Sequence, residues 1–106
     1  MQVPPVSRRT LDQLQNEIIA VSQRMNASEY EFLVLIPEFD IRQGWKEWLF
    51  NNCADWLNFK CGLSLGAVRE KVRVANALFD LPLCSEAFAV GSLSYSKARA
   101  LTRIAN

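Results

Sequence analysis

The sequence NCADWLNFKCGLSLGAVREKVRVANALF, at residues 52–79, decides the expected fold of the chain. It carries the signals of a helix, a tight turn and a second helix, in the order that a helix-turn-helix unit requires. A polar capping residue precedes each apolar segment, and a glycine separates the two segments. The signals are an N-cap at Asn51 or Asn52 for a helix through Lys60, a helix stop at Gly62, and an N-cap at Ser64 for a helix from about Leu65 to Phe79.

A second stretch with the same order of signals follows at residues 83–105. A short helix is expected to stop at Gly91, and Ser94 can cap the next helix, which runs through Ala105. The two stretches align at an offset of 30 residues and share Leu63-Ser64 with Leu93-Ser94, Arg69 with Arg99, and Arg73 with Arg103. We interpret them as a structural repeat, although the capping pattern common to many helices would also produce these matches.

The N-terminal part of the chain predicts a tail followed by a helix. Pro4 and Pro5 disfavour regular structure, so residues 1–8 are expected to form a flexible tail. Thr10 can cap a helix that runs to about Arg24. The apolar residues of this helix recur at three- and four-residue spacing, at Leu11, Leu14, Ile18 and Val21.

A second N-terminal helix is expected to start at Ser28, because Ser28 and Glu31 form a capping-box pattern. Pro37 lacks a backbone donor and predicts a kink or break just before it, and Gly44 predicts the end of this segment. No stretch of the chain alternates apolar and polar residues with the period of two typical of a half-buried strand. The chain is therefore predicted to be all-α, with about six helices in one helical domain at residues 9–106.

The composition excludes several classes of site and compartment. With 106 residues and no histidine, the chain cannot use a His general base, a Ser-His or Cys-His nucleophile pair, a His-ligated zinc ion or the histidines of an HNH nuclease. No apolar run reaches the roughly 18 residues of a membrane span, and the N-terminus has no secretory signal. We expect a cytoplasmic protein with no membrane partner and with reduced thiols that pack as small apolar residues, at Cys53, Cys61 and Cys84.

Carboxylates that could share a metal ion, Asp40, Glu47 and Asp55, lack a recognisable ligand spacing. We therefore expect a protein that is not an enzyme, with no catalytic residue, no metal site and no cofactor.

The charge of the chain is unevenly distributed. Residues 1–59 carry five Lys/Arg and eight Asp/Glu, a net charge of −3, whereas residues 60–106 carry seven Lys/Arg and three Asp/Glu, a net charge of +4. A basic half of this kind permits contact with DNA. The residues that we expect to contact nucleic acid are Arg69, Arg73, Asn76, Lys97, Arg99 and Arg103.

Two alternatives to DNA contact remain open at this stage. A helix–turn–helix corner inside a plain bundle has the same sequence pattern, and Arg69 and Arg73 could pair with acids of the negative half, such as Glu38 or Asp40. A cluster of aromatic residues also predicts a core or a protein-interaction surface, and the latter implies a homodimer or another protein partner. The cluster consists of Trp45, Trp48, Phe50, Trp56 and Phe59.

Three segments resemble the N-terminal part of the domain-of-unknown-function 222 family, also called the 13E12 repeat family. They are FLVLIPEFDIRQGW (32–45), WLNFKCGLSLGAVREKVRVANALFDLP (56–82) and SEAFAVGSLSYSKARALTRIAN (85–106). The similarity runs from about Leu14 to the end, and its most specific motifs are REKVRVA (69–75) and LSYSKARALTR (93–103). Pro37 departs from the family, whose members usually keep a helix-forming residue there.

Members of this family usually continue beyond this region into a C-terminal HNH endonuclease domain. The resemblance therefore implies a bacterial or phage-like protein linked to DNA cleavage, with the HNH domain as the partner of this region in longer relatives. The nuclease residues have no counterpart in the present sequence, which is expected to be a natural truncation or a piece of a longer chain. The expected function is that of a non-catalytic helical accessory domain that contacts DNA through its basic C-terminal half.

Overall fold

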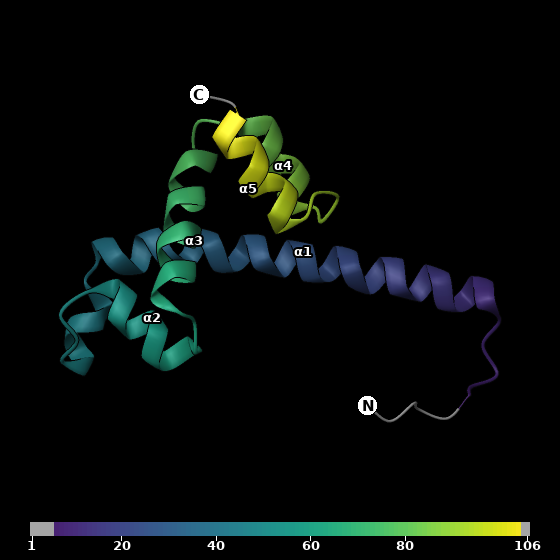
Figure 1. The fold of residues 1–106 in the computed structure, drawn as a ribbon, viewed down its shortest axis with the longest axis horizontal. Coiled ribbons are helices and arrows are strands. Elements are labelled where there is room, and N and C mark those ends of the chain that lie inside the picture. The colour runs from purple at the N-terminus through teal and green to yellow at the C-terminus, as the bar shows by residue number, and fades with distance from the viewer. Residues whose placement is uncertain (1–5, 105–106) are drawn as a thin grey trace.

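The first helix, α1, spans Leu11–Ile41 and is the longest element of the molecule (Figure 1). The computed structural model describes residues 6–104, so residues 1–5 of the predicted tail lie outside the described residues, and residues 6–8 are exposed and not helical. Thr10 caps α1 as predicted. Its Oγ1 accepts a hydrogen bond from the backbone N of Gln13 at 3.1 Å, and Gln13 Oε1 accepts one from the backbone N of Thr10 at 2.8 Å.

The single helix α1 replaces the two helices that the sequence predicts here. The predicted start at Ser28 is wrong, because no glycine or proline separates Arg24 from Ser28 and the helix continues through them. The helix also continues through Pro37 to Ile41, so the predicted break is wrong as well. A proline in a helix interior costs about 3 kcal/mol. We attribute the tolerance of Pro37 to the burial of the preceding turn, where Leu33 is 0% exposed and Ile36 is 4% exposed.

Five further elements follow α1 along the chain. They are the 3₁₀ helix η1 (Gly44–Trp48) and the helices α2 (Cys53–Cys61), α3 (Leu65–Leu78), α4 (Pro82–Ala89) and α5 (Tyr95–Ile104). Residues 6–104 contain no strand, which confirms the all-α prediction. They form five α-helices, close to the predicted number of about six, because two of the predicted helices are joined in the continuous α1. Ala105, the predicted end of the last helix, lies outside the described residues.

The local signals that separate α2, α3, α4 and α5 act as predicted. Asn52 Oδ1 accepts a hydrogen bond from Asp55 N at 2.8 Å and caps α2. Ser64 Oγ accepts one from Ala67 N and caps α3. The two predicted glycine stops both have left-handed backbones, with φ of 69° at Gly62 and 85° at Gly91. Glycine adopts this conformation without the steric cost that a Cβ atom adds.

The core lies where α3 crosses α1, and α4 and α5 cover it from one side (Figure 1). The largest fully buried side chains come from α1, α3 and α4 and are Leu33, Val68, Val74 and Phe88. The ring of Tyr30 in α1 packs edge-on against Phe88, with 5.4 Å between ring centroids. α2 and η1 lie near the C-terminal end of α1, where Leu57 is also buried. This arrangement fixes α3 and α5 against each other.

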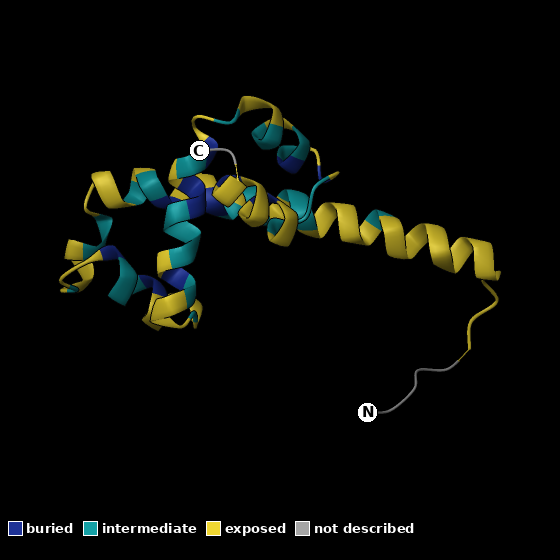
Figure 2. Cartoon of the chain, turned by 45° about the horizontal axis from the view of Figure 1, so that its top comes forward, coloured by how far each residue is buried: buried dark blue, intermediate teal, exposed yellow. Residues whose placement is uncertain are grey.

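The N-terminal part of α1 extends away from the other helices and is exposed along most of its surface (Figures 1 and 2). Its apolar side chains include some of the most exposed in the molecule, with exposed fractions of 86% at Leu11 and 68% at Ile18. Within residues 6–104, no helix combines the length and the apolar character that a membrane span requires.

Candidate functional site

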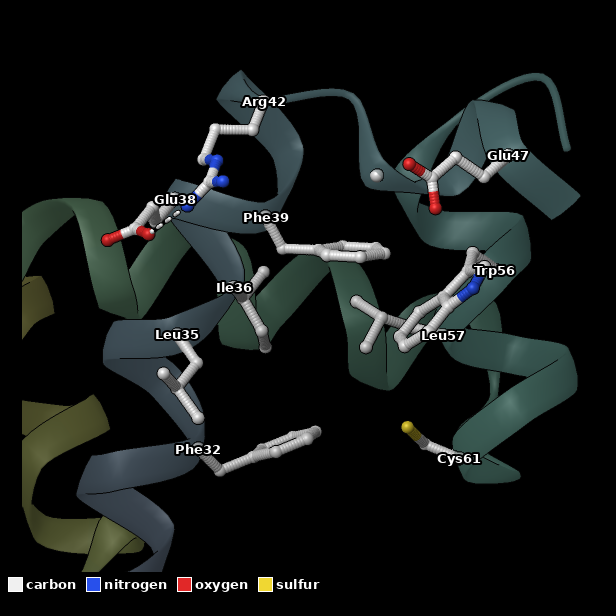
Figure 3. A pocket seen from close by; sticks show the side chains of 11 residues that line it. Phe32, Leu35, Ile36, Glu38, Phe39, Arg42, Glu47, Trp56, Leu57 and Cys61 are labelled. Atoms are coloured by element: carbon white, nitrogen blue, oxygen red, sulfur yellow. Dashed lines mark hydrogen bonds and ion pairs between the residues drawn. The ribbon is translucent and has the colours of Figure 1, made fainter.

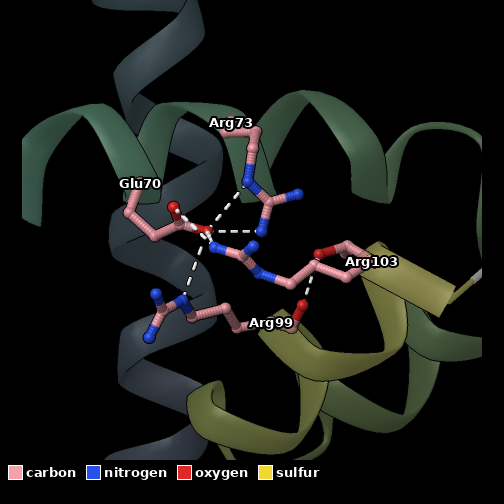
Figure 4. A network of polar contacts seen from close by, with 5 residues as sticks. Glu70, Arg73, Arg99 and Arg103 are labelled. Atoms are coloured by element: carbon pink, nitrogen blue, oxygen red, sulfur yellow. Dashed lines mark hydrogen bonds and ion pairs between the residues drawn. The ribbon is translucent and has the colours of Figure 1, made fainter.

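The two predicted helix-turn-helix-like units are present as the pairs α2–α3 and α4–α5. In each pair a left-handed glycine follows the first helix, and a serine hydroxyl caps the second helix. The two second helices, α3 and α5, pack against each other. Arginines from both helices meet in the space between them (Figure 4).

Three of these arginines converge on one carboxylate, that of Glu70 in α3. Arg73 Nε lies 2.8 Å from Glu70 Oε1, and a second guanidinium nitrogen of Arg73 donates to the same oxygen. Arg99 Nε lies 3.2 Å from Glu70 Oε1, and Arg103 Nη2 lies 3.2 Å from Glu70 Oε2. We call these four residues the arginine cluster. It joins the two helix pairs across 33 residues of sequence.

The arginines of the cluster are more exposed than the carboxylate that they surround. The side chain of Glu70 is 22% exposed, whereas those of Arg73, Arg99 and Arg103 are 38%, 47% and 57% exposed. Hydrogen bonds from Arg73 contribute most to lowering the pKa of Glu70 from 4.5 to about 2, with further contributions from Arg99 and Arg103 and an opposing effect of desolvation. Glu70 is therefore ionised at neutral pH. Three guanidinium groups and one carboxylate leave two net positive charges on this surface.

The other predicted nucleic-acid contacts lie outside the cluster. Arg69, Asn76 and Lys97 are all exposed. Within residues 6–104, Arg69 has no ion-pair partner, although it lies one helical turn from Arg73. The predicted equivalence of Arg69 with Arg99 therefore does not extend to their contacts.

The predicted acid partners of Arg69 and Arg73 are wrong. Glu38 pairs with Arg42 at 3.1 Å, and Asp40 Oδ1 accepts a hydrogen bond from Trp45 Nε1. Arg73 instead pairs with Glu70 in its own helix, because a spacing of three residues brings the two side chains together. That spacing is visible in the sequence and could have identified Glu70 as the partner of Arg73.

A contact that does join the two halves of the chain borders the arginine cluster. Lys71 in α3 pairs with Glu29 in α1, and its Nζ lies 4.0 Å from the centroid of the Tyr95 ring in α5. Burial raises the pKa of Tyr95, so the ring remains neutral and offers its face to the cation. Glu29, Lys71 and Tyr95 thereby connect three helices. The sequence does not predict this contact, because its members are far apart along the chain.

The predicted aromatic cluster is divided between the interior and the surface. Trp56 is half-buried and packs against Phe39, with ring centroids 4.3 Å apart. Trp48 and Phe59 are 57% and 73% exposed, and Lys60 Nζ lies 3.8 Å from the centroid of the Trp48 ring. Part of the cluster is thus core, and part is an exposed apolar surface.

An apolar pocket of about 550 Å³ lies between the C-terminal part of α1, η1 and α2 (Figure 3). Trp56 Nε1 is a buried donor at its wall and has no hydrogen-bond partner within the described part of the chain. Charged side chains, Glu38, Arg42 and Glu47, stand at one side of the pocket, opposite Cys61. The lining residues are Phe32, Leu35, Ile36, Glu38, Phe39, Arg42, Gly44, Glu47, Trp56, Leu57 and Cys61.

The cysteines differ from one another in environment. All three are free thiols, and Cys53 is buried and Cys84 half-buried as expected of small apolar residues, but Cys61 is exposed. Burial, with a smaller contribution from Asp40, raises the pKa of Cys53 to about 11, and burial also raises that of Cys84. These two thiols are protonated at neutral pH and are poor nucleophiles.

The residues from 6 to 104 include no group of three or more Cys, Asp or Glu side chains placed to hold a metal ion. Comparison of the chain with protein-family models, curated proteins and solved structures gives no match.

Proposed function

We propose that the chain is a non-catalytic helical module that binds DNA through the arginine cluster, as an accessory domain of an HNH-endonuclease-type protein. The observation that carries the proposal is the convergence of Arg73, Arg99 and Arg103 from two helices on the single carboxylate of Glu70. The resemblance to the 13E12 repeat family supports the link to an HNH protein.

The geometry of the cluster suits the phosphates of a nucleic-acid backbone. Guanidinium groups bind phosphate oxygens in the same paired fashion in which they bind a carboxylate. Glu70 holds three of these groups on one surface, so less side-chain entropy is lost when an anion binds to them. Contacts to the backbone position a protein on DNA without reading its sequence. We therefore expect binding with little sequence preference.

The test measures binding to a short DNA duplex by fluorescence anisotropy between about 50 and 200 mM salt, where phosphate contacts weaken steeply. The double variant Arg99→Ala/Arg103→Ala should bind more weakly and should flatten the slope of log K against log salt by about 2. The control variant Arg42→Ala/Lys46→Ala removes the same charge from two exposed residues outside the arginine cluster. Arg42 follows the C-terminal end of α1, and Lys46 lies in η1. Equal effects in the two variants, or no binding by the parent chain, would overturn the proposal.

The same preparation tests the non-catalytic part of the proposal. With no histidine in the chain, we expect no cleavage of plasmid DNA in magnesium, manganese or zinc. Cleavage that a chelator stops and a point substitution in this chain removes would contradict it.

A second candidate function is protein interaction through the exposed part of the aromatic cluster. Trp48, Leu49 and Phe59 are 57%, 93% and 73% exposed, and exposed large apolar side chains that gather on one surface mark interaction sites. Under this alternative, association should be insensitive to salt, lost in Trp48→Ser and kept in Phe79→Ser, since Phe79 is even more exposed, at 75%, but lies at the end of α3.

A further inference from the structure

The N-terminal part of α1, residues 11–25, carries an apolar stripe that nothing in the described chain covers; we call this part the arm. The stripe consists of Leu11, Leu14, Ile18, Val21 and Met25, with exposed fractions of 86%, 37%, 68%, 43% and 66%. Figure 2 shows nearly every residue of the arm as exposed, whereas buried and half-buried residues occur among the exposed ones in the C-terminal part of α1. A helix that stays in water is expected to have a polar surface. The exposed apolar stripe therefore indicates that another molecule covers it.

The spacing of the stripe identifies the kind of partner. Its members follow one another at intervals of three, four, three and four residues, which is the heptad spacing of positions a and d in a coiled coil. The heptad register assigns Ile19 to position b, away from the stripe. A helix face of this kind accepts another helix with the same spacing.

Where the arm ends, at residues 23–30, α4 and the turn after it contact the face of α1 that lies opposite the stripe. Three residues of α1 in this stretch make these contacts. The carbonyl O of Gln23 lies beside Gly91, Asn26 donates to Gly91 O at 3.1 Å, and Tyr30 packs on Phe88. In the heptad register they occupy positions f, b and f, on the side away from a and d. A partner helix can therefore lie along the stripe without displacing α3, α4 or α5.

We propose that the partner is the arm of a second copy of this chain, paired in the antiparallel direction. An alignment that sets Ile18 opposite Val21 of the second copy also sets Leu14 opposite Met25. The same alignment brings Glu17 beside Arg24 of the second copy, and by symmetry this pair forms twice. Charge complementarity thus accompanies the match of the apolar residues. Glu17 also pairs with Arg9 of its own chain, at 2.6 Å.

The parallel direction fits the charges less well. It would set Glu17 beside Ser22, and Arg24 beside Glu29 of the other copy. Glu29 is 29% exposed and is already paired with Lys71 across the core. The antiparallel direction also places the two cores at opposite ends of the paired arms, because the core begins to contact α1 only near Gln23.

The first experiment is sedimentation equilibrium of the purified chain over a range of micromolar concentrations. We expect a monomer–dimer equilibrium that Ile18→Glu abolishes and Ile19→Glu preserves, since Ile19 is also exposed, at 47%, but lies off the stripe. Circular dichroism checks that both variants remain helical. A monomer at all concentrations, or equal effects of the two substitutions, would overturn the proposal, and a dimer lost only in Trp48→Ser would assign self-association to the aromatic surface.

The second experiment tests the direction of pairing by charge reversal. Glu17→Arg alone and Arg24→Glu alone should each weaken self-association roughly tenfold, because each puts like charges at both symmetric contacts. A mixture of the two variants should associate about as well as the parent chain, since the mixed dimer has opposite charges at both contacts. If Glu17→Arg has no effect, or if the mixture associates no better than the single variants, the antiparallel arrangement is overturned.

Discussion

The two helix-turn-helix-like units share their local signals but differ in what surrounds their turns. Gly62 and Gly91 both have left-handed backbones, and a capping serine follows each of them. A Cβ atom at Gly62 would meet nothing within 4 Å, whereas one at Gly91 would lie 2.2 Å from the carbonyl O of Gln23 in α1. The same sequence signal thus specifies only a conformation in one unit, and both a conformation and a close contact in the other.

The largest expected difference between the units concerns these two glycines. Gly62→Ala should lower the free energy of unfolding by about 1 kcal/mol, the cost of a left-handed backbone for a residue with a Cβ atom. Gly91→Ala should lower it by about 3 kcal/mol or more, because overpacking against α1 adds to the same backbone cost. Urea unfolding of the two variants measures both values.

Gly66→Ala is the matched control for these substitutions. Gly66 lies inside α3, and a Cβ atom there would meet nothing within 4 Å. Alanine is favoured over glycine in a helix interior by about 1 kcal/mol, so this variant should be more stable than the parent chain. If Gly62→Ala and Gly91→Ala lower the free energy of unfolding equally, the close contact of Gly91 with α1 does not affect stability.

A smaller effect is expected where Glu70 joins the two units. Glu70→Gln removes the carboxylate and leaves Arg73, Arg99 and Arg103 to repel one another, so it should lower Tm by several degrees at neutral pH. The exposed Glu86→Gln in α4 should leave Tm unchanged.

The pH dependence of this effect follows from the lowered pKa of Glu70. Because the folded-state pKa of about 2 lies below the ordinary value of 4.5, the stabilisation is present above about pH 4.5 and is lost as the pH falls towards 2. The difference in Tm between the parent chain and Glu70→Gln should therefore shrink over that interval. A difference that stays constant down to pH 2 would mean that ionised Glu70 does not stabilise the fold.

Local signals were sufficient to predict the helices that are short and bounded by strong stops. Asn52, Gly62, Ser64, Gly91 and Ser94 act within one turn of themselves, so their effect does not depend on the tertiary structure. The all-α class could be predicted as well, because no stretch alternates apolar and polar residues with the period of a strand.

The sequence did not predict the continuity of α1 or the arginine cluster, because both depend on tertiary contacts. The proline at position 37 is tolerated because the turn before it, with Leu33 and Ile36, is buried in the core, whereas the capping-box pattern at Ser28 lies in a stretch that no glycine or proline interrupts. The cluster requires α5 to lie against α3, which the sequence repeat does not specify. Only the pairing of Glu70 with Arg73, three residues apart in one helix, could be read from the spacing.

The smallest expected effect on stability is the difference between substitutions of Arg69 and of Arg73, the two arginines that recur together in the sequence repeat. Arg69 is exposed and has no ion-pair partner within residues 6–104, so Arg69→Ala should change the free energy of unfolding by no more than about 0.5 kcal/mol. Arg73→Ala breaks the closest contact of Glu70 and should lower Tm measurably. Thermal unfolding of the two variants in low salt compares them directly, and in high salt the difference should narrow, because salt screens a partly exposed ion pair. If Arg69→Ala proves as destabilising as Arg73→Ala, the two arginines act together as the repeat suggests.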